Sequence, residues 1–216
     1  MPLQFVAEPF NGRNLVEERL EAYERRFPSA YIPTAGIPAR MPRPYIKPSA
    51  PSYAPHPVYA LRIDNLLKGG KGLAAARPWG FYYALDNVEG LPVARAHIMM
   101  DQSGLPSFGS LSFGIYSSLA VPALDQLFNL PIVQDGAFEA RCLRCKAIFF
   151  AAIWLKSTNA GTDLIYPLES KYNILKGEPP YLADDFMAAL PHTARKFVRR
   201  NAPEGQSATD VFEVAP

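Results

Sequence analysis

The sequence predicts an α+β fold: a largely antiparallel sheet of hairpins packed with one or two helices, preceded by an N-terminal helix and an extended Pro-rich arm. Strand-like segments from residue 58 onward are separated by short turns, as in hairpins. Helix-like segments do not alternate strictly with these strands, which argues against a parallel sheet of βαβ units. Prolines crowd residues 28–57 and are sparser afterwards, which separates the arm from the body.

The length and composition set the domain organisation. A chain of 216 residues suits one core of about 150 residues plus an appendage. We therefore predict an N-terminal helix and arm over residues 1–57, an α+β body over 58–200 and a polar C-terminal tail over 201–216. The chain is 49% hydrophobic and 19% charged, so it is not a disordered protein. A formal net charge of +2 gives no general indication of nucleic-acid binding.

The N-terminus and the cysteines indicate the compartment. The first residues lack a basic leader followed by an apolar core, and the longest apolar run, 147–155, is half the length of a membrane span. Two cysteines do not make the disulfide framework of a small secreted module. We expect a soluble, cytoplasmic protein.

The first helix is expected to begin at Asn14. Asn14 suits an N-cap, and Glu17 stands where a capping box places its acid. Pro28 ends the pattern. A helix this short is marginal alone in water, so its apolar stripe must dock on the body or on another chain. The stripe consists of Val16, Leu20, Tyr23 and Phe27.

The arm over residues 28–57 is expected to be extended, because each proline fixes its own backbone and biases the preceding residue to extended geometry. Aromatic and aliphatic residues such as Tyr31, Tyr45 and Tyr53 alternate with these prolines, so the arm should lie along a protein surface. Pro48 and Pro51 form a PxxP pattern without the flanking cation of SH3 ligands.

The body has a strand at 58–63 and then a glycine turn at 69–72. A hairpin follows, and after it a strand, a helix, a second hairpin and a last helix interrupted by Pro191. Their expected ranges are 81–85 with 93–100, 107–113, 115–128, 139–154 with 163–166, and 183–200. The second hairpin is the most hydrophobic part of the chain, and it should supply the core residues Phe149, Phe150, Ile153, Trp154 and Leu155.

Cys142 and Cys145 form a CxxC pattern flanked by cations, which would favour thiolate. Thioredoxin-like chemistry needs such a pair at the start of a helix in a βαβ unit, and a zinc site needs two further ligands. On a strand the two side chains would point to opposite faces. We therefore interpret them first as half-buried thiols, with redox work or a zinc ion shared between subunits as alternatives.

Ser112 stands in a sequence one residue away from the GxSxG elbow of serine hydrolases, with Ser110 in place of the first glycine. Asp163 or Asp184, followed by His192, would complete the chain order of that triad. The elbow requires a parallel sheet, which the hairpins oppose, so turn and core serines are the simpler interpretation.

Other motifs favour structural roles. Residues 70–75 match GxGxxA by letter, but Pro78 leaves no room for the helix that a dinucleotide needs. His56, His97 and His192 are scattered, and no HExxH pair occurs. Four cations near the C-terminus suit a helix end better than a phosphate contact: Arg195, Lys196, Arg199 and Arg200.

No catalytic, cofactor-binding or metal residue is assigned from these patterns. We expect a noncatalytic structural, assembly or protein-interaction protein whose N-terminal arm binds another copy or a different subunit, with no membrane association. A nucleic-acid binder that uses the basic C-terminal helix end is the least favoured interpretation. The alternative is a small hydrolase or thiol-dependent enzyme that uses Ser112, or Cys142 and Cys145, with His97 or His192.

Overall fold

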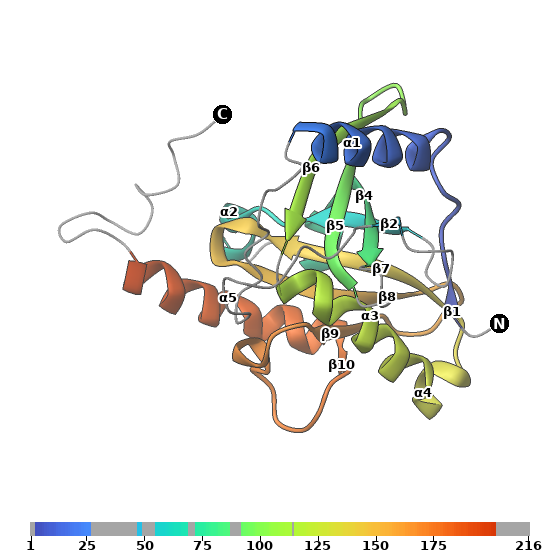
Figure 1. The fold of residues 1–216 in the computed structure, drawn as a ribbon. Coiled ribbons are helices and arrows are strands. Elements are labelled where there is room, and N and C mark those ends of the chain that lie inside the picture. Colours follow the sequence, from blue (N-terminus) through green and yellow to red (C-terminus); the bar gives the residue numbers. More distant parts are fainter. Residues whose placement is uncertain are drawn as a thin grey trace, which may run out of the picture.

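A ten-stranded, mostly antiparallel sheet organises the chain in the computed structural model (Figure 1). The structure describes residues 3–26, 47–48, 55–68, 72–86, 92–113 and 115–201. The strands are β1 (Leu3–Gln4), β2 (Lys47–Pro48), β3 (His56–Ala60), β4 (Arg77–Asp86), β5 (Pro92–Met100), β6 (Pro106–Phe113), β7 (Phe138–Cys145), β8 (Phe150–Ser157), β9 (Leu164–Pro167) and β10 (Tyr181–Leu182). The helices are α1 (Gly12–Arg26), α2 (Ile63–Leu67), α3 (Ile115–Phe128), α4 (Pro131–Gln134) and α5 (Ala183–Asn201), with 3₁₀ turns η1 (Gly72–Ala75), η2 (Lys146–Ile148) and η3 (Ser170–Tyr172).

The sheet runs in the order β10-β9-β8-β7-β3-β4-β5-β6, with β1 beside β7 and β2 beside β4. The pairs of β7 with β1 and with β3 are parallel, and the other pairs are antiparallel. The predicted α+β class with a largely antiparallel sheet is therefore confirmed. The long connection from β3 to β7 lets two sets of antiparallel strands share one sheet.

Both expected hairpin pairings are present. Strands β4 and β5 pair antiparallel, and β8 pairs with β9 so that Trp154 lies opposite Ile165. The stretch 139–154 holds two strands, however, because η2 and the left-handed residue Phe149 (φ 53°) reverse the chain between β7 and β8. Phe149 is consequently 63% exposed, so its expected place in the core is wrong. The other four expected core residues are buried.

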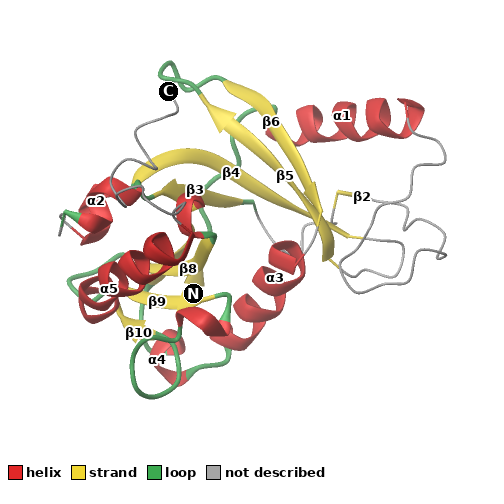
Figure 2. Cartoon of the chain, turned by 90° about the vertical axis from the view of Figure 1, so that its left-hand side faces the viewer, coloured by secondary structure: helices red, strands yellow, loops and turns green. Residues whose placement is uncertain are grey.

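Helices α1, α3 and α5 cover the sheet (Figures 1 and 2). The long C-terminal helix α5 buries Phe186, Leu190 and Ala194 against β8 and its neighbours. Helix α3 packs Leu124 and Leu127 on the opposite face of β7 and β8. Helix α1 covers β4 and β5 on the face turned away from α3. Within the described residues, no helix is long and apolar enough to cross a membrane.

Two residues of the apolar stripe of helix α1 pack on the sheet of the same chain. Val16 is fully buried and Leu20 is 6% exposed, both against β4 and β5. Gly12 permits this close approach, since a Cβ there would lie 2.2 Å from the hydroxyl oxygen of Tyr83. The helix begins at Gly12, so Asn14 lies within it and donates to Asn11 instead of capping the helix. Phe27, most of the Pro-rich arm and residues 202–216 lie outside the described residues.

Candidate functional site

Polar side chains gather on the face of β4–β7 that looks toward α3, termed here the α3 face. Because alternate residues of a strand share a face, Arg95 and His97 of β5 lie beside Tyr82 of β4. Ser110 and Ser112 of β6 lie directly opposite His97 and Arg95. The next set comes from β7, where Cys142 and Arg144 also point to this face. It is the face that α1 leaves free.

A bulge in β4 brings Trp79 to the same place. Val58 pairs with Gly80 and Tyr59 pairs with Pro78, so Trp79 is an extra residue in β4. Gly80 has φ 134°, and a Cβ on it would lie 2.0 Å from the carbonyl oxygen of Ile98. Glycine is therefore required at this position. The bulge sets the indole of Trp79 against the imidazole of His97, with 4.4 Å between ring centroids.

His97 is 4% exposed and is held between two glycines. A Cβ on Gly80 would lie 3.0 Å from its Nε2, and one on Gly109, the extra residue of a bulge in β6, would lie 3.2 Å from its Nδ1. Nε2 lies 3.2 Å from the carbonyl oxygen of Trp79. Since a carbonyl can only accept, Nε2 carries the hydrogen and Nδ1 keeps a lone pair.

Burial, assisted by nearby positive charges, lowers the pKa of His97 to about 4. These charges belong to Arg144, Lys146 and Arg95. The imidazole is therefore neutral at pH 7.

The same three cations lie on aromatic rings. The guanidinium carbon of Arg95 is 4.5 Å from the centroid of the Tyr82 ring. Arg144 lies 5.6 Å from that ring, 6.0 Å from the ring of Trp79, and donates to the Tyr82 hydroxyl. The ammonium of Lys146 is 4.5 Å from the Trp79 ring, and its side chain is exposed. We call Trp79, Tyr82, Arg95, His97, Arg144 and Lys146 the cationic aromatic cluster.

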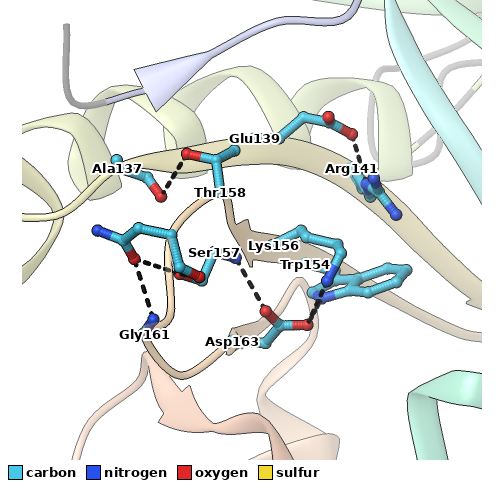
Figure 3. A network of polar contacts seen from close by, with 10 residues as sticks. Ala137, Glu139, Arg141, Trp154, Lys156, Ser157, Thr158, Gly161 and Asp163 are labelled. Carbon is cyan, nitrogen blue, oxygen red and sulfur yellow. Dashed lines mark hydrogen bonds and ion pairs between the residues drawn. The ribbon is translucent and has the colours of Figure 1, made fainter.

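On the other face, a groove of about 480 Å³ is lined by Tyr59, Phe81, Asp101, Glu139 and Arg141 among others. Its size suits a small ligand. Its charged groups are already engaged within the protein. Arg141 pairs with Glu139 and stacks on Tyr59, and Asp101 accepts from the backbone and hydroxyl of its own turn (Figure 3 for Arg141 and Glu139). These contacts suit a structural role.

The two cysteines lie on opposite faces of β7, as the sequence predicts for a strand. Cys145 packs among the residues under α5, and Cys142 lines a cavity under α3. Burial raises the pKa of each thiol to about 11, so the neighbouring cations do not produce a thiolate at neutral pH. Each is a free cysteine. Among the described residues, no three His, Cys, Asp or Glu side chains cluster as metal ligands.

The residues of the possible hydrolase triad are separated by the strand order. Ser112 lies on β6 at one edge of the sheet, whereas Asp163 precedes β9 near the other. Asp184 and His192 lie on α5, which packs on the face opposite Cys142. Asp163 instead accepts from the indole of Trp154. Of the candidates named from the sequence, Ser112, His97 and Cys142 share the α3 face.

The remaining sequence motifs have structural environments. Gly72–Ala75 forms a single 3₁₀ turn, so no long helix follows the glycines. Arg195 donates to the carbonyl oxygen of Leu67, which ties α5 to α2. His192 is exposed on α5, and His56 stacks on Phe5.

Trp79, Tyr82 and Arg95 are the cluster residues that the sequence patterns did not single out. The alternation of Arg95 with His97, and of Cys142 with Arg144, was a usable signal, because it places each pair on one face of a strand. No protein-family model, curated protein or solved structure matches this chain.

Proposed function

We propose that this protein is a noncatalytic binding protein for a small anionic ligand, which it holds on the cationic aromatic cluster. The observation that supports this is the convergence of Arg95, Arg144 and Lys146 on two aromatic rings around one histidine. Carboxylate and phosphate groups are the anions that guanidinium and ammonium groups recognise.

Like charges held close together repel each other, and a bound anion would offset that repulsion. The aromatic rings hold the cations in place through cation–π contacts, each worth about 0.5–2 kcal/mol depending on exposure. Because the cations are held before a ligand arrives, less side-chain entropy is lost on binding. Lys146 is the exposed member and would meet the ligand first.

Binding without catalysis is favoured by the state of the two reactive groups on this face. An imidazole with a pKa of about 4 is a weak general base at neutral pH. A buried thiol with a pKa of about 11 is a poor nucleophile there. The pKa of neither group lies near 7, where that of a catalytic base or nucleophile would be expected.

Calorimetric titration of the full chain with inorganic phosphate and with acetate tests the proposal. The parent should bind at least one of these anions, and Lys146→Gln should weaken that binding about tenfold or more. Lys196→Gln removes an exposed lysine of α5 outside the cluster and should leave binding unchanged. Absence of binding by the parent, or equal losses in the two variants, would contradict the proposal.

Association through the N-terminal arm is a second proposal, and it has a specific observation in its favour. Phe10, next to α1, is 92% exposed, which is more than any other large apolar side chain among the described residues. Val16 and Leu20 of the stripe are already buried against the sheet, so a partner would have to meet Phe10 and the arm. Light scattering on the parent and on Phe10→Ser tests this, with a fall in molecular mass expected for the variant. Equal masses for the two proteins would contradict it.

A further inference from the structure

A small cavity lies between α3 and the sheet, next to the cationic aromatic cluster. Its volume is about 40 Å³. The apolar part of its wall consists of Ala84, Ala120, Val121, Leu124, Ala140, Ala151, Ile153 and Leu168. Four of these eight residues are alanines, whose short side chains leave the space open. Since a cavity needs roughly 10–15 Å³ to hold one water, this cavity has room for about three waters or a chain of about three carbons.

The polar part of the wall is shared with the cluster. Tyr82 and Arg95 line the cavity and belong to the cluster, and His56, Arg141 and Cys142 are the other polar residues that line it. The guanidinium of Arg95 lies over the Tyr82 ring, so a positive charge lies beside an apolar cavity. A ligand whose anionic group met Arg95 would therefore place its next atoms beside the alanine-lined space.

We propose that the ligand is an amphipathic organic anion: a carboxylate or phosphate group that carries an aliphatic chain of about three carbons. The anionic group lies against Arg95, Arg144 and Lys146, and the chain fills the cavity under α3. This inference rests on the proposed anion-binding function and adds the shape and polarity of the ligand to it.

Affinity should depend on chain length if the chain enters the cavity. Burial of one methylene strengthens binding about fourfold. Acetate, propionate and butyrate should therefore bind in steps of about fourfold, with no further gain once the chain exceeds the cavity. Methyl phosphate and propyl phosphate, measured in parallel, distinguish a phosphate from a carboxylate ligand. Butyrate and propyl phosphate carry the same propyl chain, so the one that binds more tightly identifies the anionic group.

A cavity-filling variant provides the decisive comparison. Ala120→Leu extends a side chain from α3 into the cavity and suits a helix. It should remove the gain from acetate to butyrate while acetate binding is retained. Ala188→Leu makes the same change at an exposed position of α5 and should leave the gain intact. Ala151→Val fills the same space from β8, and it serves as the test if Ala120→Leu does not fold.

The outcomes separate this inference from the proposed function. If acetate and phosphate bind but chain length has no effect, the cavity is not a ligand site and the anion-binding proposal stands. If the folded cavity-filling variants keep the gain in affinity from acetate to butyrate, the cavity is likewise not the site of the chain. If no anion binds to the parent, the anion-binding proposal and this inference are both wrong.

Discussion

Trp154 donates its indole hydrogen to the carboxylate of Asp163 across 2.9 Å (Figure 3). The other oxygen of that carboxylate accepts from the backbone amide of Ser157 at 2.8 Å. One side chain thus joins the end of β8 to the start of β9. The indole is 5% exposed, so its N–H has little access to water if Asp163 is lost.

Asp163→Ala should lower the free energy of unfolding by about 2–3 kcal/mol, because it leaves a buried indole donor and a backbone amide without the charged acceptor. Urea denaturation measures this change. Lys156→Gln is the matched control, since its ammonium lies 3.8 Å from the same carboxylate but is 42% exposed, and it should cost less than about 1 kcal/mol. Similar losses in the two variants would show that the bonds to Trp154 and Ser157 have no special importance.

Gly80→Ala should be strongly destabilising, by about 2–4 kcal/mol, because two effects add there. Its φ of 134° strains any residue with a Cβ, and that Cβ would collide with the carbonyl of Ile98. Gly104→Ala isolates the first effect, since Gly104 has φ 79° and no atom lies within 4 Å of the added Cβ. It should cost about 1 kcal/mol. Thermal or urea unfolding of the two variants should therefore differ clearly, and equal costs would rule out the collision.

Sequence patterns predicted the strands better than they predicted the site. Local patterns indicated β4, β5 and β6, which bury apolar residues against α1, and a continuous apolar run indicated β8, which is buried on both faces. The place of β3 between β4 and β7 depends on contacts far apart in the chain, which local patterns do not contain. Fold class was therefore predictable, and strand order was not.

The cationic aromatic cluster depends on two irregularities that periodicity cannot show. A strict alternation would have placed Trp79 on the same face as Phe81, away from His97. The bulge at Trp79 reverses that side chain, and Gly80 was the available sign of it. Phe149 was misplaced for a related reason, since a left-handed turn interrupts an apolar run without any glycine to mark it.

Leu20→Ala tests the packing of α1 on its own sheet. The side chain is 6% exposed against β4 and β5, so the truncation should cost about 2–4 kcal/mol. Packing within one chain predicts that this loss is independent of protein concentration. Glu18→Ala, at an exposed position of the same helix, should change stability by less than about 0.5 kcal/mol. Urea denaturation over a hundredfold range of concentration would reveal packing between chains as a shift of the midpoint.

The two thiols should react slowly while the protein is folded. Burial raises the pKa of Cys142 and of Cys145 to about 11, so little thiolate is present at pH 8. Ellman's reagent should label both at a rate at least tenfold below that of the protein in urea. Cys142→Ser and Cys145→Ser, measured separately, assign the rates. Rapid labelling of Cys142 in the folded parent would instead indicate an activated thiol and would favour the thiol-dependent enzyme.

Protonation of His97 should make the stability of the protein depend on pH. Its pKa falls from 6.5 to about 4 on folding, so at pH 7 both states are mostly neutral and the shift contributes little. Between about pH 6.5 and 4 the unfolded imidazole binds a proton that the folded one excludes, and the free energy of unfolding falls as the pH is lowered. For one proton the slope is at most about 1.4 kcal/mol per pH unit.

His97→Gln tests this dependence. Its free energy of unfolding should fall less steeply with decreasing pH over this range, although its stability at pH 7 will also change. Urea denaturation of both proteins at several values between pH 7 and 4.5 makes the comparison, and His56 and His192 are common to both. Parallel profiles would mean that His97 takes up its proton in the folded protein as readily as in the unfolded chain, despite the positive charges of Arg95, Arg144 and Lys146.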